Sequence, residues 1–285
     1  MLTIRLDLPC LLQAAVAALA LVGPTAAQAQ AQAKLEARYT AFLGGVTVGK
    51  GSWVIDFRDD QYTAAASGAT TGLLKIFAGG KGSSASRGTV ANGQPVPRNY
   101  AATITSDKKK DEVEIAIENG TVKDYSVKPP SVPDPDRVPI TEVHRKGVMD
   151  PMTASLMRVA GSADLMTAET CQRSSAIFDG RMRYDLRLAF KRMDKVKPEK
   201  GYQGPVVVCS VRFTPLAGHI PTRSVVKYLT TMEEMEVWLA PVSGTRIVVP
   251  FRISIPTPIG EAVLEATQFV ASSASSATPS PARAL

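Results

Sequence analysis

The chain has 285 residues, of which 45% are hydrophobic and 21% are charged, and its formal net charge at pH 7 is +7. This length suffices for one sizeable core. The two histidines and three cysteines have no metal-ligand spacing, and beyond the N-terminus no stretch approaches transmembrane length, which argues against a metal site and a membrane span.

The N-terminus has the layout of a secretory signal peptide. One arginine precedes an apolar run from about Leu8 to Val22, and small residues follow. The alternative, a membrane anchor, would need roughly 20 apolar residues. We expect a signal peptide over residues 1–29, cleaved after Ala29, with Ala31 and Ala33 as alternative sites, and a mature protein in the bacterial periplasm.

The first predicted strands are LEARYTAFLGG and GSWVIDF, the latter with Trp53, Ile55 and Phe57 at alternating positions. The intervening GGVTVGKG imitates a phosphate-binding loop. However, Gly51 replaces the Ser or Thr that would hold Mg²⁺, and a strand follows where that motif needs a helix. We therefore expect a hairpin turn here.

Further along, DEVEIAI and TVKDYSV flank Asn119 and Gly120, which is a strong signal for a β-hairpin. After the proline-rich stretch KPPSVPDPDRVP, the segment MDPMTASLMRVAG predicts one short helix near residues 150–160. Asp150 can cap this helix, Pro151 suits its first position, and Gly161 can end it. Its apolar stripe would face the core and consists of Met152, Leu156, Met157 and Ala160.

Residues 177–190 read IFDGRMRYDLRLAF, with apolar side chains at most even positions and charged ones at most odd positions. This period of two predicts a strand with one apolar and one charged face. A charged active site is the alternative, but arginines separate Asp179 from Asp185 on the same face, and we expect exposed ion pairs of little energetic weight. We interpret the stretch as a wall of the core.

From Ser174 onward the chain returns to strands: PVVVCSVRF, SVVKYL, MEVWLA, TRIVVPFRISI and GEAVLEATQFV. Pro250 cannot donate to a ladder, so its strand lies at a sheet edge or contains a bulge. Ten or more strands predict a mainly β fold, a large antiparallel sheet curled into an open or spiral barrel. We expect one domain over residues 34–270 and a disordered tail over residues 271–285, which lack an apolar period.

Loss of Cys10 with the signal peptide leaves Cys171 and Cys209, and such a pair in an oxidising compartment most often forms a structural disulfide. Two free thiols or a redox couple are the alternatives, although no Cys-x-x-Cys spacing supports the latter. The basic balance suggests anionic partners such as lipid headgroups, lipopolysaccharide or cell-wall polymer. We expect the two lysine-rich runs, SDKKKDE and KRMDKVKPEK, to be solvated turns.

Catalytic chemistry is hard to find in the sequence. His144 and His219 have no ligand partner at a short offset, and no Gly-x-Ser-x-Gly elbow is present. We expect no catalytic residue, no metal, no cofactor and no nucleic-acid partner.

Four short motifs occur together: CQ at Cys171, FDGRMRYDL, YQGPVVVC ending at Cys209, and TPLAGH before Ile220. With them the chain resembles a family of exported bacterial proteins known only as a domain of unknown function, DUF family 3108. The resemblance implies a periplasmic, β-rich protein, and the layout is similar to open-barrel envelope proteins that include lipoprotein carriers. The resemblance to this family also implies a sequence signature, whose members are candidate binding residues: Phe178, Asp179, Gly180, Arg181, Arg183, Tyr184 and Asp185.

The expected function is that of a non-enzymatic periplasmic protein of the cell envelope. Its curved sheet would bind an amphipathic or anionic component, namely a lipid, a lipoprotein or a cell-wall fragment, with Met152, Met157 and Trp238 as lining residues. A structural or scaffolding protein that contacts other envelope proteins through its sheet edges is the alternative. An enzyme is the third hypothesis.

Overall fold

The computed structural model describes residues 32–72, 79–106 and 109–274. The predicted signal peptide lies outside these ranges, and so does the predicted tail from residue 275 onward. The first four residues of that predicted tail, residues 271–274, are instead the end of a strand. In the described part of the chain, no helix has the length and apolar character needed to cross a membrane.

One 15-stranded sheet contains the described strands, and all but one of its strand pairings are antiparallel. The first part of the chain forms β1 (Gln32–Leu43), β2 (Val46–Arg58), β3 (Gln61–Thr70), β4 (Gly80–Ala91), β5 (Gln94–Ser106), β6 (Lys109–Glu118) and β7 (Thr121–Lys128). The second part forms β8 (Met157–Arg158), β9 (Arg173–Phe178), β10 (Arg183–Val196), β11 (Lys200–Gly201), β12 (Gly204–Ala217), β13 (Glu236–Pro241), β14 (Ile247–Ile255) and β15 (Ala262–Ala274).

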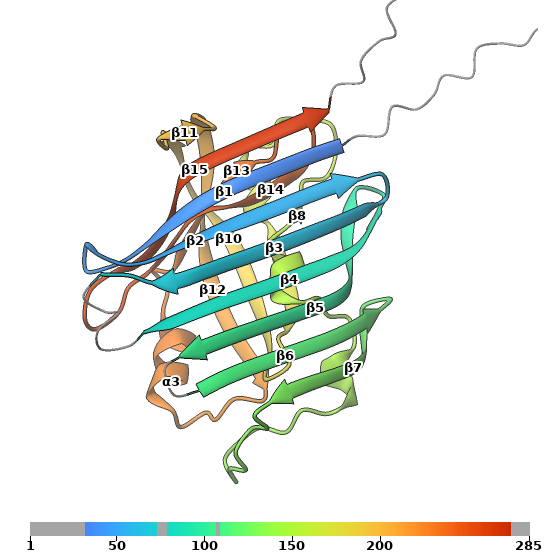
Figure 1. The fold of residues 1–285 in the computed structure, drawn as a ribbon, viewed down its shortest axis with the longest axis vertical. Helices are drawn as coiled ribbons and strands as arrows, with labels where there is room; N and C mark the ends of the chain where they lie inside the picture. Colours follow the sequence, from blue (N-terminus) through green and yellow to red (C-terminus); the bar gives the residue numbers. More distant parts are fainter. Residues whose placement is uncertain (1–31, 73–78, 107–108, 275–285) are drawn as a thin grey trace, which may run out of the picture.

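The sheet runs in the order β7-β6-β5-β4-β3-β2-β1-β15-β14-β13-β12-β10-β9, with β8 beside β14 and β11 beside β15. Strands β1 and β15 join the two halves in its middle. Strands β1 to β7 form the near layer, and β10 and β12 cross behind them at a steep angle (Figure 1). The sheet therefore curls over itself without closing, which confirms the predicted open barrel.

A short segment, residues 146–149, connects the two edges of the sheet. The Val148 amide donates to the carbonyl oxygen of Gly120 beside β7, at 2.9 Å, and the Met149 amide donates to the carbonyl oxygen of Ala176 in β9, also at 2.9 Å. A small hydrophobic cluster fills this seam from both sides. Its buried members are Val113, Ile115, Ile117, Val122, Val148 and Phe178.

Strand β12 is buried on both faces over residues 206–209. Val206 and Val208 belong to the main hydrophobic cluster, whereas Val207 and Cys209 belong to a second cluster that also contains Cys171. A strand covered on both faces has a continuous apolar run rather than an alternating one, and this is the pattern of PVVVC.

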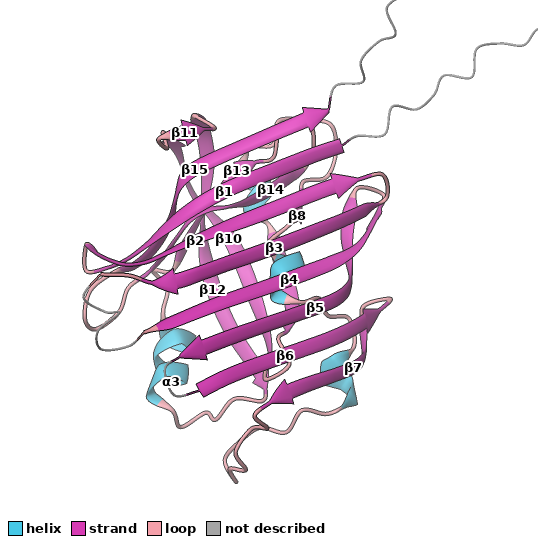
Figure 2. Ribbon diagram, in the orientation of Figure 1, coloured by secondary structure: helices cyan, strands magenta, loops and turns pink. Residues whose placement is uncertain are grey.

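The helices differ from the predictions (Figure 2). Helix α2 (Pro151–Ala154) has the predicted cap at Asp150, but it ends far before Gly161. The chain leaves it early because Met157 and Arg158 pair with β14 as strand β8. The stretch SVVKYL was wrongly predicted as a strand and belongs to helix α3 (Ser224–Thr231). Two short 3-10 helices, η1 (Glu142–Arg145) and η2 (Ala168–Cys171), were not predicted.

Several local predictions are confirmed. Asn119 and Gly120 have φ values of 50° and 70° in the β6–β7 turn, as a two-residue hairpin requires. The GGVTVGKG stretch begins with the β1–β2 turn and continues into β2. The β13–β14 register shifts next to Pro250, so this strand contains the expected bulge. The run KRMDKVKPEK was wrongly predicted to be a turn, since β10 extends to Val196.

Candidate binding site

An apolar hollow of about 560 Å³ lies between the strands of the near layer, helix α2 and the β14–β15 hairpin. Aromatic and aliphatic side chains from distant parts of the sequence meet there. The larger ones among those that line the hollow include Tyr39, Trp53, Tyr100, Met152, Pro250, Ile253 and Leu264.

The hollow exists because several neighbouring inward positions of the near layer carry small residues. Gly51 of β2 pairs with Gly68 of β3, and two residues before Gly68, Ala66 of β3 pairs with Ser84 of β4. A Cβ on Gly51 would lie 2.8 Å from the carbonyl oxygen of Ser67, so the close approach of the strands requires glycine there. These small positions leave a space that the larger Trp53 and Tyr100 side chains border.

A buried polar cluster around Asp150 borders the hollow next to Met152. The Asp150 side chain is fully buried. Its Oδ1 accepts the amides of Met152 and Thr153, at 3.0 and 2.9 Å, and its Oδ2 accepts the hydroxyls of Thr153 and Ser86, at 2.5 and 3.1 Å. The Tyr62 hydroxyl lies 2.5 Å from Thr153 Oγ1. With four donors, this carboxylate is satisfied within the protein and is occupied with holding α2 in place.

Burial dominates the electrostatics of this region. It raises the pKa of Asp150, and hydrogen bonds from Thr153, Ser86 and the Met152 amide oppose that rise. Burial, together with the negative charge of Asp150, raises the pKa of Tyr62 and of Tyr100 to about 12. Both tyrosines therefore keep their proton at neutral pH. Tyr100 gives the hollow a neutral hydroxyl, which can orient the polar end of a ligand.

The signature residues around Asp179 form a tight turn at the seam rather than part of the hollow. The Asp179 carboxylate accepts the amides of Arg181 and Met182, at 2.8 and 2.6 Å. Gly180 has a φ of +88°, and a Cβ on it would lie 2.6 Å from a methyl carbon of Val113 in β6. The turn needs glycine both for its conformation and for this close approach.

The remaining signature side chains fix the same seam. Arg181 Nη2 lies 2.9 Å from Asp111 Oδ1 and also donates to the Pro129 carbonyl oxygen, so it joins the turn to β6 and to the chain after β7. The Phe178 ring packs edge-on against Tyr125, with centroids 5.2 Å apart. Two further local contacts complete the set: Arg183 with Asp185, at 2.7 Å, and Tyr184 with Phe213, at 5.4 Å between ring centroids.

The alternation predicted for residues 177–190 is only partly present. Leu188 is buried and Arg187 is exposed, as a wall requires. Phe190 is 43% exposed, contrary to the prediction, and a register shift against β12 follows it directly. Arg183, expected on the charged face, has a side chain only 11% exposed. The stretch is part of the seam at its beginning, half-buried over residues 181–186, and a wall only at Arg187 and Leu188.

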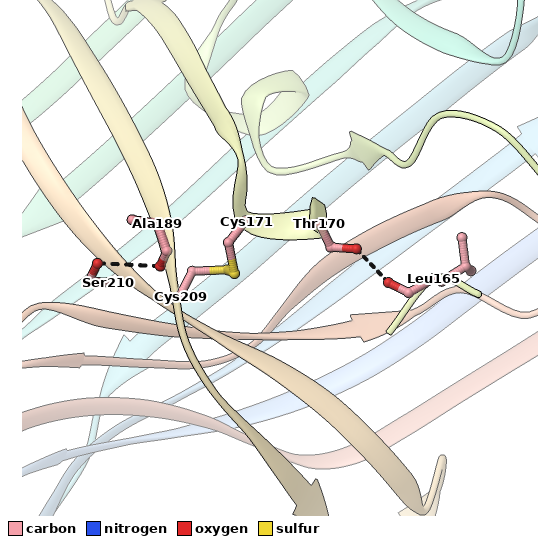
Figure 3. Close-up of a disulfide and its surroundings, with 6 residues drawn as sticks. All are labelled: Leu165, Thr170, Cys171, Ala189, Cys209 and Ser210. Atoms are coloured by element: carbon pink, nitrogen blue, oxygen red, sulfur yellow. Dashed lines mark hydrogen bonds between the residues drawn. A yellow bond between two sulfur atoms is a disulfide. The ribbon is translucent and has the colours of Figure 1, made fainter. Parts of the chain in front are cut away.

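The predicted disulfide between Cys171 and Cys209 is confirmed (Figure 3). Both cysteines are fully buried, and the bond joins the end of η2 to β12. The loop before η2 is fixed in turn by Thr170, whose hydroxyl donates to the Leu165 carbonyl oxygen at 2.5 Å. The disulfide thus pins this loop onto the second hydrophobic cluster.

Of the three lining residues expected from the sequence, the structure places only Met152 at the hollow. Met157 packs against the second cluster. The Trp238 ring lies between the guanidinium groups of Arg192 and Arg252, 5.2 and 4.9 Å from its centroid. In the described part of the chain, no three His, Cys, Asp or Glu side chains lie close enough to hold a metal ion.

Strands β3, β4 and β5 were not predicted from the sequence. Their apolar signal is weak because every residue over 64–69 in β3 and over 82–86 in β4 is alanine, serine or glycine, on both faces of the sheet. Glycine within a strand marks a place where another chain segment or a ligand can approach closely.

Comparison with known proteins places the chain in a family. Residues 38–267 match the family described as a protein of unknown function, DUF3108, and the chain belongs to it. Among solved structures, the chain is similar to a β-barrel-like protein of domain of unknown function DUF1849 from Brucella abortus, at 9% sequence identity and a TM-score of 0.46. The similarity covers 85% of this chain and 98% of the Brucella chain. No curated protein matches.

Proposed function

We propose that this member of DUF3108 is a non-enzymatic binding protein of the cell envelope. It holds the apolar part of an amphipathic envelope component, a lipid or the acyl chain of a lipoprotein, in the hollow beside α2. The observation that carries this proposal is the hollow itself, which is apolar and is kept empty by Gly51, Gly68 and Ala66.

The size and chemistry of the hollow suit such a ligand. Its volume of about 560 Å³ falls within the roughly 300–1,000 Å³ range of ligand pockets. Each methylene group that moves from water into it contributes about 0.8 kcal/mol. Tyr100, which lines the hollow, supplies a hydroxyl that can orient the ligand.

The proposal that the protein is not an enzyme rests on the state of its buried acids. The Asp150 carboxylate is occupied by four donors, and Asp179 accepts the amides of its own turn. The tyrosines near the hollow keep their protons at neutral pH. This inventory supplies no activated nucleophile or general base.

We also propose that the mature chain works in the periplasm. The signal-peptide layout of residues 1–29 supports export, and the buried disulfide supports an oxidising compartment. A scaffolding role through the sheet edges has less support, because residues 146–149 contact both β7 and β9.

A matched pair of variants tests the binding proposal. Ala66 lines the hollow, whereas its neighbour Ala65 is exposed on the opposite face of β3. In native mass spectrometry of protein isolated from the periplasm, the wild type and Ala65→Phe should retain a lipid mass, and Ala66→Phe should lose it. Melting temperatures check that both variants fold. A wild type that carries no lipid and binds no fluorescent fatty acid would contradict the proposal.

A further inference from the structure

Two hairpin tips with exposed apolar side chains meet at one end of the barrel. The Gly44 amide of the β1–β2 turn donates to the carbonyl oxygen of Glu261, at the β14–β15 turn, at a distance of 2.9 Å. Next to this contact, Val46 is 60% exposed and Ile259 is 76% exposed. The β1–β2 turn is the blue loop at the left of Figure 1. The exposed Val46 and Ile259 side chains on these adjoining tips form a small apolar patch at this end of the barrel.

Three lysines lie at the same end of the near layer. Lys50 and Lys81 both pair with Ala69 from its two sides, so they lie two strands apart on the same face of the sheet. Lys109 begins β6 at the same end, where it pairs with Ser106. Lys50, Lys81 and Lys109 form no ion pair with any residue that the structure describes.

The exposed face of the near layer carries further positive charge. Lys50 and Lys81 line a shallow concavity of about 890 Å³, together with Arg38, and Glu199 is its one acidic residue. Such an arrangement attracts anionic groups. The remaining lining side chains are small and polar, chiefly serines and threonines, so the face offers hydrogen bonds and little steric obstruction.

The opposite end of the same strands has a different character. The β2–β3 turn carries Asp59 and Asp60, and the β6–β7 turn carries Glu118 and Asn119. The two ends of the near layer therefore differ: one has apolar tips and lysines without an ion pair, and the other has acidic or neutral polar turns, with Lys34 and Lys123 paired to Glu36 and Glu118.

We propose that the end with the apolar tips docks onto an anionic lipid bilayer. Val46 and Ile259 enter the boundary between headgroups and acyl chains, and Lys50, Lys81 and Lys109 contact lipid phosphates. This inference rests on the proposed function, because the lining of the hollow reaches Ala41 and Val48 beside the β1–β2 turn. The docked end is thus the end at which a lipid would enter.

Vesicle co-sedimentation of the full mature chain tests the docking. Phosphatidylglycerol vesicles should bind the wild type far better than phosphatidylcholine vesicles, and salt should weaken that binding. Lys50→Glu with Lys81→Glu should lower the partition coefficient at least about tenfold, because each lysine near an anionic surface changes it roughly fivefold. Lys34→Glu with Lys123→Glu changes the net charge equally at the opposite end and should have little effect.

A second pair of variants separates insertion from charge attraction. Val46→Asp with Ile259→Asp should abolish sedimentation, whereas Val143→Asp, at a side chain 70% exposed in η1, should not. Equal loss in the test and control variants, or equal binding to neutral vesicles, would overturn the proposal. So would a wild type that binds soluble polyphosphate as tightly as vesicles while the tip variants bind like the wild type.

The docking and the proposed function can fail separately. Ala66→Phe should dock normally while losing its lipid mass, and the tip variants should lose the vesicles while still binding a fluorescent fatty acid in solution. Docking that fails while lipid is retained overturns only this inference. Docking that persists in a wild type without lipid overturns the proposed function and leaves the docked end without a role in lipid entry.

Discussion

A Cβ atom on Gly218 would lie 2.0 Å from the carbonyl oxygen of Arg181. This relationship joins TPLAGH and FDGRMRYDL, two of the sequence motifs that accompany family membership. Gly218 has a φ of +83°, so both its backbone conformation and its surroundings require glycine. The two motifs therefore pack against each other in the folded chain.

Gly218→Ala should therefore lower the free energy of unfolding by about 2 to 4 kcal/mol, since it combines backbone strain with a clash against main-chain atoms. Gly45→Ala is a matched control, with a φ of +81° and nothing within 4 Å of its Cβ position. It should cost only about 1 to 2 kcal/mol. Urea unfolding measures both, and equal losses would show that the contact with Arg181 has no energetic weight.

Loss of the disulfide should be costly. Cys171→Ser should lower stability by roughly 2 to 5 kcal/mol, because the bond constrains the unfolded chain. Denaturant unfolding with and without reductant measures this, and the reduced wild type should resemble the variant. Titration that finds two free thiols in the native chain would contradict the disulfide.

The wall formed by β10 can be tested at adjacent residues. Leu188→Ala removes a buried side chain from the second cluster and should cost about 2 to 5 kcal/mol. Arg187→Ala, at an exposed position, should cost well under 1 kcal/mol. Thermal denaturation distinguishes the two, and a greater loss for the arginine variant would show that the charged face is the structural one.

The buried Asp150 makes a contribution to stability that depends on pH. Burial raises its pKa above the ordinary value of 3.8. The folded state thus holds the proton more tightly than the unfolded state, and this contribution is greatest below pH 3.8 and is lost as the pH rises through the folded-state pKa. Asp150→Asn cannot titrate, so the stability difference between wild type and variant should shift in favour of the variant as the pH rises. Unfolding curves from acid to neutral pH measure it, and a constant difference would contradict the raised pKa.

The sequence predicted elements whose information is local. Asn119 and Gly120 specify their turn through the left-handed conformation that both residues accept, and Asp150 with Pro151 marks the start of α2. The disulfide between Cys171 and Cys209 could be predicted because the remaining cysteine, Cys10, was assigned to the signal peptide. The turn and the helix start are each determined by a few neighbouring residues, and the disulfide was predicted from the expected oxidising compartment.

The remaining features depend on tertiary contacts. Valines in SVVKYL favour a strand, yet α3 is anchored by Tyr228, whose hydroxyl donates to the Pro256 carbonyl oxygen at 3.1 Å. Helix α2 ends early because β8 pairs with β14. The hollow escaped prediction for a related reason: its strands are recognisable by the absence of large side chains, and a search for apolar periodicity passes over alanine, glycine and serine.

The pairing of β1 with β15 also governs how the chain can assemble over time. Leu35 lies opposite Ala271, so residues at the two ends of the described chain become neighbours in the middle of the sheet. In a polypeptide that emerges N-terminus first, from a ribosome or a translocation pore, the hairpins formed by β1 to β7 can fold early. One edge of β1, however, remains unpaired until β15 has been released. Contacts of such long sequence separation slow folding, so one edge of β1 stays open to pairing with another chain until β15 is available.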